Sequence, residues 1–372
     1  MTFTLTINAQ QFRTHLANVL AQNSDAGADV IPVIKGNGYG FGRSLLAGEV
    51  TSLGLEQVCV GTIWEAEELL EGFSGTVIVL EPILGADQFA LLEWKKLLTT
   101  HADRLVAVIA GTDIGQLKEF GLKQVWLEVR TSMNRFGLTV SQIATLTKQF
   151  ENQISIAGFS LHLPIAQSNL SSLVKFETQS VNTYSNKVRE VLGLISWLRE
   201  VAEIDSGPLS VMISHLSPSE VAAVRRECPD VQLRIRLGTS LWLGAEKALT
   251  VTGTVLAIHH LSSTDKAGYQ QNSGGKQVAV VSGGTAHGVA LAAPIPATNL
   301  RKRGIAIVEG IAQAVGKVRS PFSLNGQNLN FVEPPHMQVS MLWADNLGLK
   351  VGDQINCNVR NTTASFDAVI WE

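Results

Sequence analysis

The sequence predicts an N-terminal (β/α)8 TIM-like barrel followed by a C-terminal mostly-β domain. Short apolar runs alternate with helical patterns along the first part of the chain, which is typical of parallel strands joined by helices. Beyond Leu243 the helical patterns stop, and short strands follow that are separated by Gly, Asn and Ser turns. We therefore expect a barrel over residues 1–242 and a β domain over residues 243–372, with residues 1–8 able to pair with the β domain. A doubly wound open sheet is the alternative to the barrel.

The barrel prediction depends on eight apolar runs. Before them, Thr2–Ile7 alternates as a strand, and Asn8 can cap a helix over Ala9–Gln22. The eight predicted barrel strands are Val30–Ile34, Val58–Val60, Thr76–Leu80, Leu105–Ile109, Val125–Val129, Ile154–Phe159, Leu209–Ile213 and Val231–Ile235. The helical patterns between them include Ile63–Leu70, Asp87–Leu98, Ser141–Phe150, Lys175–Glu203 and Pro218–Arg226. Eight such units over about 230 residues have the size of a (β/α)8 barrel.

The β domain is predicted from shorter runs without long helices between them. Its expected strands are Thr252–Ile258, Gln277–Val281, Gly304–Val308, Gln338–Met341 and Asp353–Cys357.

The amino-acid composition limits the kinds of partner that we expect for this chain. The 372 residues are 45% hydrophobic and 16% charged, with a net charge of -3, which gives no reason to expect nucleic acid or an anionic membrane. Cys59, Cys228 and Cys357 lie far apart and have no metal-binding spacing. Such sparse cysteines fit a reducing compartment, and we see neither a signal peptide nor a membrane-spanning run, so we expect a cytoplasmic protein without a metal site.

One stretch carries the strongest chemical signal, Lys35-Gly-Asn-Gly-Tyr-Gly-Phe-Gly42. A strand that ends in a cation, followed by a glycine loop and a helix N-terminus, suits an anionic group. The spacing matches neither a Walker loop nor a dinucleotide fingerprint. A lysine placed before the glycines suits chemistry on a carbonyl, whereas the alternative is a tight turn with an exposed lysine.

Polar residues gather at the predicted C-terminal strand ends, where barrel enzymes place their active sites. Together they predict a site for an anionic ligand such as one that carries a phosphate. They are Lys35, Glu128, Arg130, Arg135, His162, Ser214, His215, Ser217, Arg236, Gly238, Thr239 and Ser240.

With these motifs the chain resembles the pyridoxal-phosphate-dependent alanine racemases over almost its whole length. The matching stretches are the Lys35 loop, Leu127-Glu-Val-Arg-Thr-Ser-Met-Asn-Arg-Phe-Gly137, Phe159-Ser-Leu-His162 and Val339-Ser-Met341. The resemblance implies pyridoxal 5'-phosphate as cofactor, a small amino acid as substrate, and a homodimer whose subunits share active sites.

The resemblance also assigns roles. Lys35 forms the Schiff base and acts as one of two bases. Arg135 hydrogen-bonds the phenolic oxygen of the cofactor, Arg236 faces its pyridine nitrogen, and His162 belongs to the strand motif beside it. The phosphate contacts are Tyr39, Ser217, Gly238 and Thr239, and Met341 lines the site of the partner subunit.

Several positions depart from the family pattern. Glu128 stands where the family often has a carbamylated lysine, so we hypothesise that it pairs with Arg135; a glutamate paired only for solvation is the alternative. Thr285, within Gly283-Gly-Thr-Ala-His-Gly288, stands where the family has its second catalytic base, a tyrosine. His287 is a candidate replacement, or a structural histidine. Leu342 and Phe366 replace a family aspartate and a phosphate-contacting tyrosine.

Three functions remain open at this point. The first is a racemase that interconverts L- and D-alanine or another small amino acid. The second is a cofactor-binding relative without racemase activity, with a regulatory or cofactor-holding role. The third is an enzyme that catalyses another reaction at the α-carbon.

Overall fold

The structure is a computed structural model that describes residues 2–111, 120–150, 154–165, 184–201, 208–269, 271–291 and 318–372. The chain divides into two compact units. The barrel unit comprises Thr14–Gly38 and Gly42–Gly244, and the β unit comprises Met1–Arg13, Tyr39–Phe41 and Ala245–Glu372.

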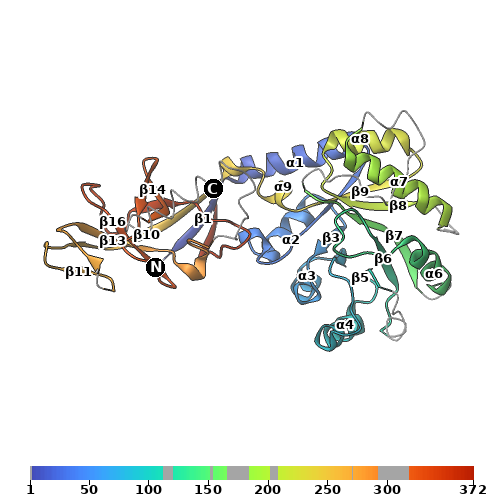
Figure 1. The fold of residues 1–372 in the computed structure, drawn as a ribbon, viewed down its shortest axis with the longest axis horizontal. Helices are drawn as coiled ribbons and strands as arrows, with labels where there is room; N and C mark the ends of the chain where they lie inside the picture. Colours follow the sequence, from blue (N-terminus) through green and yellow to red (C-terminus); the bar gives the residue numbers. More distant parts are fainter. Residues whose placement is uncertain are drawn as a thin grey trace. The chain divides into compact units, whose positions relative to one another are not determined.

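The barrel unit contains eight parallel strands that curve into a barrel with helices around the outside (Figure 1). The first and last strands of the sheet meet through a bridge between Val33 and Cys59, where Ile34 N donates to Cys59 O at 2.8 Å. This closure confirms the predicted barrel and makes the open-sheet alternative wrong. In sheet order the strands are β2 (Asp29–Pro32), β9 (Gln232–Leu237), β8 (Ser210–Ser214), β7 (Ser155–His162), β6 (Gln124–Val129), β5 (Leu105–Ile109), β4 (Thr76–Val79) and β3 (Gln57–Val60).

The helices begin and end close to the predicted positions. Asn8 caps the first one, because its Oδ1 accepts a hydrogen bond from Gln11 N at 2.9 Å. Residues 175–183 and 202–203 of the predicted Lys175–Glu203 helix lie outside the described residues. The described helices are α1 (Ala9–Asp25), α2 (Arg43–Ser52), α3 (Ala66–Gly72), α4 (Gln88–His101), α6 (Val140–Phe150), α7 (Asn186–Val201), α8 (Pro218–Glu227) and α9 (Thr239–Trp242). None of them is long and apolar enough to cross a membrane.

Alternate strand residues fill the barrel interior. The apolar interior includes Ile31, Val33, Cys59, Ile78, Val106, Val108, Trp126 and Met212.

A bulge between β6 and β7 changes which residues share the interior face. Val125 pairs with Ile156, but Trp126 pairs with Gly158, so one extra residue stands on β7. Beyond the bulge Glu128 lies beside Ser160, and both lie above Trp126 on the interior face. The interior therefore changes from apolar to polar toward the C-terminal strand ends.

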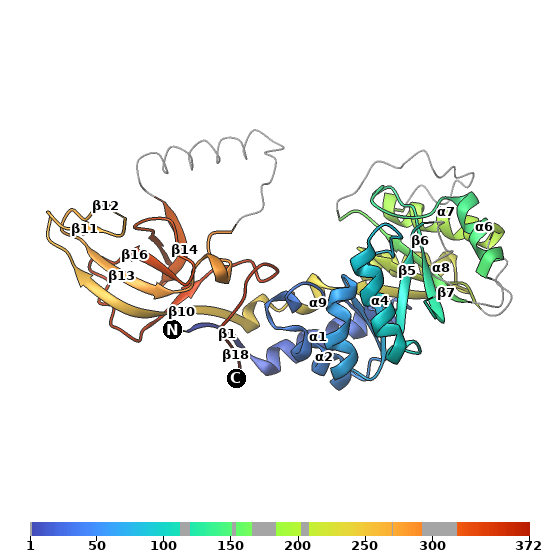
Figure 2. The same ribbon diagram turned by 90° about the horizontal axis from the view of Figure 1, so that it is seen from below.

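The β unit is built around the long strand β10 (Leu249–His260), which is prominent in Figure 2. β10 pairs with β1 (Phe3–Ile7), β13 (Gln277–Ser282) and β17 (Gln354–Cys357). Phe3, Val255, Val281, Phe322 and Leu342 belong to its apolar core. The other described strands are β11 (Lys266–Ala267), β12 (Gln271–Asn272), β14 (Arg319–Leu324), β15 (Gln327–Asn330), β16 (Val339–Trp343) and β18 (Ala368–Trp371). The predicted strand Gly304–Val308 lies outside the described residues.

Trp126→Ala tests the interior packing. Trp126 is 1% exposed in the barrel, and the guanidinium of Arg234 lies 5.4 Å from its ring centroid. We expect the substitution to lower the free energy of unfolding by about 3–5 kcal/mol, because it removes a large buried side chain and leaves a cavity. Urea unfolding followed by circular dichroism measures this. Trp64→Ala is the control, because Trp64 is 57% exposed, and an equal loss in both variants would contradict the expectation.

Candidate active site

Lys35 lies at the mouth of the barrel, beyond the end of β2. It continues the alternation of Ile31 and Val33, whose side chains point into the barrel. A Cβ built on Gly61 would lie 3.2 Å from Lys35 Cβ, so a side chain at position 61 would crowd the lysine stem. Partial burial, and then the charges of Arg135 and Arg236, lower the pKa of Lys35, while Glu65 opposes the shift. These surroundings make the neutral, nucleophilic amine easier to form than in a free lysine.

Arg236, Ser214 and His162 form a row across three neighbouring strands. The register pairs Arg236 with Ser214, and Ser214 with His162. Arg236 is 6% exposed, and its Nη2 donates to Leu161 O at 3.2 Å and lies 3.4 Å from His162 Nδ1. Its Nε is buried and has no hydrogen-bond partner in the described part of the chain. A buried guanidinium N–H without a partner is uncommon in proteins and indicates a place for an acceptor.

The histidines of this mouth are held in their neutral form. Burial, followed by the nearby charges of Arg236 and Arg135, lowers the pKa of His162 to about 3. His162 Nδ1 lies 2.9 Å from Ser214 Oγ. His215, whose ring centroid lies 5.2 Å from that of His162, also has a lowered pKa, because of burial and then the charge of Lys187. The positive charges that lower these pKa values, which include those of Arg236 and Lys187, also favour an anionic ligand at this site.

Arg135 and Glu128 do not form the expected ion pair in the structure. Glu128 is 4% exposed and accepts a hydrogen bond from Ser160 Oγ at 2.7 Å, because the bulge places these two residues side by side. Arg135 is exposed in the loop after β6, and its guanidinium lies 5.2 Å from the ring centroid of Phe136. The hypothesis that Glu128 pairs with Arg135 is therefore replaced by a Glu128–Ser160 contact.

Glu65 is a residue of this mouth that sequence reasoning missed. Its two carboxylate oxygens accept hydrogen bonds from Gly36 N at 2.9 Å and from Gly61 N at 2.7 Å. It thereby ties the lysine loop to the loop after β3. Glu65 lies among other glutamates at the start of a helix, so its sequence context gives no signal for this role.

The expected phosphate contacts lie at the starts of two helices. Ser217 is the N-cap of α8, and both its N–H and its hydroxyl donate to Glu220 Oε2, at 2.9 and 3.0 Å. These donors are therefore already engaged by a carboxylate. Gly238 precedes the short helix α9, and Thr239, its first residue, is exposed. The amide groups at this helix start have no partner within their own helix, as at any helix N-terminus.

The remaining predicted site residues belong to the β unit. Tyr39 is buried, with φ 56°, in the segment Tyr39–Phe41. A Cβ at Gly40 would lie 2.8 Å from the ring of Phe366, so a side chain there would collide with Phe366. Met341 lies on β16 and packs against a small apolar cluster that includes Val278 and Val332.

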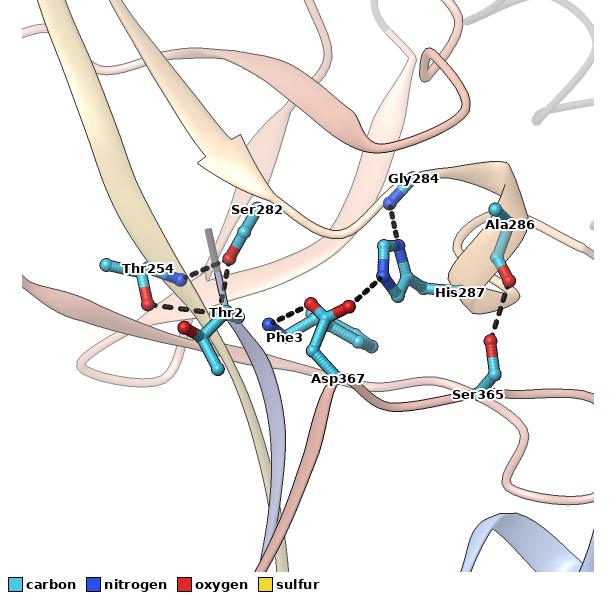
Figure 3. Close-up of polar contacts among 9 residues, drawn as sticks. All are labelled: Thr2, Phe3, Thr254, Ser282, Gly284, Ala286, His287, Ser365 and Asp367. Carbon is cyan, nitrogen blue, oxygen red and sulfur yellow. Dashed lines mark hydrogen bonds and ion pairs between the residues drawn. The ribbon is translucent and has the colours of Figure 1, made fainter.

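His287 is enclosed by its own unit, as Figure 3 shows. Gly284 N donates to its Nδ1 at 3.2 Å, its Nε2 lies 3.3 Å from Asp367 Oδ1, and the residue is 6% exposed. Asp367 Oδ2 also accepts from Phe3 N at 2.8 Å. Both ring nitrogens are engaged, so the structure supports the structural alternative for His287 rather than a second base. Thr285 lies beside it, half-buried, in the turn after β13.

The family model of the alanine racemase N-terminal domain matches residues 7–225. The chain belongs to this family. The resemblance seen in the sequence is thereby confirmed.

Curated alanine racemases are distant relatives of the chain. The alanine racemase of Treponema denticola is 24% identical over 165 residues, and this match spans 42% of each of the two chains. That of Halorhodospira halophila is 23% identical over 275 residues, which cover 71% of this chain and 68% of the relative.

Solved alanine racemases share the fold. The structure from Bacillus anthracis, with bound L-Ala-P, has a TM-score of 0.68 and 14% identity, and the match covers 100% of this chain and 95% of that chain. The structure from Bartonella henselae, with covalently bound pyridoxal phosphate, has a TM-score of 0.66 and 16% identity, and the match covers 100% of both chains. Identities this low show the fold alone.

The low pKa of His162 predicts a pH effect on stability. The folded pKa of about 3 lies below the ordinary value of 6.5, so below pH ~6.5 the unfolded chain binds a proton that the folded barrel does not. We expect stability to fall as the pH drops from 6.5 toward 3, and His162→Gln to weaken this decline. Urea midpoints across this pH range measure it, with His259→Gln, an exposed histidine of the β unit, as the control. An unchanged decline in His162→Gln would contradict the assignment.

Proposed function

We propose that the chain is a pyridoxal-phosphate-dependent racemase that interconverts L- and D-alanine, or another small amino acid, by moving the α-proton. The observation that carries the proposal is the pair formed by Lys35 and Arg236 at the barrel mouth. A lysine with a lowered pKa lies in the field of a buried arginine whose Nε has no partner among the described residues. Family membership supports this reaction class.

The residues present fit the proposed cofactor. The unpartnered Nε of Arg236 suits an acceptor such as a pyridine nitrogen, and an arginine does not readily give up its proton. Lys35 would hold the aldehyde group, and Arg135 would face the phenolic oxygen. Gly238 and Thr239 would hold the phosphate with their amides, and Tyr39 would contact it as well. Ser217 could join them only if Glu220 released its donors.

When bound, pyridoxal phosphate supplies a conjugated ring that takes up electron density from the α-carbon. The residues of the chain would bind and orient the cofactor and the substrate, and they would move protons. Lys35, in its neutral form, takes the proton from the α-carbon on one side, or returns it there. Arg236 carries no proton that a ring nitrogen could easily take, and it therefore limits how much electron density the ring draws. That limit suits proton transfer over more drastic bond cleavage.

The proposal includes a homodimer with shared sites, in which Met341 contributes to the site of the partner subunit. It also includes a cytoplasmic location. Cys59, Cys228 and Cys357 are unpaired and buried, which supports a reducing compartment.

A second candidate function is a cofactor-binding protein without racemase activity. The observation that favours it is Thr285 at the position of the second base, together with the engaged ring of His287. A threonine hydroxyl is too weak an acid to exchange protons with a base at neutral pH.

Lys35→Ala tests cofactor binding. With pyridoxal phosphate added, we expect the wild-type chain to show an absorbance band near ~420 nm that borohydride removes, because Lys35 holds the aldehyde. We expect Lys35→Ala to lack the band. Lys95→Ala is the control, since Lys95 lies on α4 and its ammonium packs on Phe120. A band of equal strength in Lys35→Ala would contradict the assignment.

Amino-acid exchange in deuterated water separates the two candidate functions. We expect wild-type enzyme to exchange the α-proton of L-alanine, or of another amino acid in a panel of small substrates, with inversion. Chiral chromatography and mass spectrometry measure both events. Cofactor binding without exchange of any amino acid would favour the second candidate.

A further inference from the structure

We propose that Glu65 is a positioning residue for Lys35, which holds the backbone beside the lysine and balances the charge around its amine. This inference rests on the proposed function, in which Lys35 holds the cofactor and moves the α-proton. Glu65 acts through Lys35 and needs no contact with the substrate. The residues that carry the inference all belong to the barrel unit.

The backbone of Lys35 is held on both sides. Before the lysine, Ile34 N donates to Cys59 O at 2.8 Å, at the bridge that closes the barrel. After the lysine, Gly36 N donates to Glu65 Oε1 at 2.9 Å. The first contact joins two backbones, whereas the second one depends on a side chain. The position of the chain beyond the end of β2 therefore depends on the carboxylate of Glu65.

Gly36 needs such a contact because little else restricts it. Its φ is +61°, and in the described part of the chain a Cβ there would meet no heavy atom within 4 Å beyond the adjacent residues. Glycine has the greatest backbone freedom of all residues, so packing at this position does not select its conformation. The carbonyl oxygen of Gly36 also accepts a hydrogen bond from Arg43 Nη1, at 2.7 Å. Two charged side chains thus hold the N–H and the C=O of one glycine.

Both charged side chains are themselves anchored. Glu65 Oε2 accepts a hydrogen bond from Gly61 N at 2.7 Å. Arg43 Nη2 lies 2.6 Å from Glu68 Oε2 on α3, and Glu68 Oε1 accepts from the hydroxyl of Ser44 at 2.6 Å. Hydrogen bonds to charged groups are shorter and stronger than those between neutral groups. The loop after Lys35 is therefore tied both to the loop after β3 and to α3.

The side chain of Glu65 does not serve its own helix. Glu65 is the N-cap of α3, yet its side chain makes no capping hydrogen bond. Its carboxylate bonds instead to the two loops beside Lys35. Glu67, on the same helix, has a side chain that is 48% exposed and pairs with Lys96 at 2.7 Å. Glu67 is thus a surface residue, and it provides a matched control for Glu65.

Glu65 also balances the charge around the amine. Burial lowers the pKa of Lys35 most, and the charges of Arg135 and Arg236 lower it further, whereas Glu65 raises it. A group that moves the α-proton must both take it up and return it. A carboxylate among these cations helps the amine to hold the proton between the two events. The other titratable groups near this lysine are the neutral rings of His162 and His215.

Glu65→Gln tests the inference in the cofactor-free chain. Glutamine keeps the size of the side chain, but it is uncharged and only its oxygen accepts hydrogen bonds. We expect the pKa of Lys35 to fall, because the carboxylate that raises it is removed. Acetylation by acetic anhydride over a series of pH values, followed by peptide mass spectrometry, measures this pKa. Glu67→Gln should leave it unchanged, and an unchanged or raised pKa in Glu65→Gln overturns the inference.

Glu65→Asp separates position from charge. Aspartate keeps the negative charge, but it is one methylene shorter and does not reach Gly36 N and Gly61 N together. We expect the pKa of Lys35 to lie between those of the wild type and Glu65→Gln. With saturating pyridoxal phosphate and an amino acid that the wild type exchanges, we expect α-proton exchange to slow at least about 10-fold in both variants, because a small displacement of a reacting group is costly.

Controls separate this loss from unfolding and from a wrong proposed function. Circular dichroism confirms that the variants are folded, and Glu67→Gln should exchange within about twofold of the wild-type rate. Exchange at the wild-type rate in both Glu65 variants overturns the inference, while the proposed function stands. A wild-type chain without a borohydride-sensitive band overturns the proposed function, whereas a lowered pKa of Lys35 in Glu65→Gln still supports the action of Glu65 on the lysine.

Discussion

The buried guanidinium of Arg236 is the constraint on which the barrel mouth depends. It bonds a backbone carbonyl and approaches a neutral histidine, and it forms no ion pair within the described part of the chain. A buried cation without an anion is costly, so the surrounding groups lose their own positive charge more readily. Burial is the largest cause of the lowered pKa of both His162 and Lys35, and the charge of Arg236 lowers both values further. The positive charge that contributes to the lowered pKa of Lys35 also favours an anionic ligand at the barrel mouth.

The histidines of the β unit differ from those of the barrel mouth, which lie near cationic groups. In the β unit a carboxylate lies beside each of two histidines. Asp367 serves His287 and also accepts from the backbone of Phe3, so this contact ties the N-terminal strand to the loop after β13. The hydrogen bonds from Phe3 and His287 hold the pKa of Asp367 below its usual range, although burial opposes them. Glu333 serves His336, whose ring stays partly exposed. The first contact therefore joins two segments of the β unit, whereas the imidazole of the second contact remains partly exposed.

Much of the fold could be predicted from local patterns, since the apolar runs, the Asn8 cap and the alternation that leads to Lys35 are all local. The site was less predictable because it depends on register. The extra residue on β7 places Ser160, rather than Phe159, beside Glu128, and no sequence pattern marks that bulge. Glu65 reaches two loops from a helix start whose neighbours are also glutamates. The contact between Thr285 and His336 arises from a strand pairing across a long sequence separation.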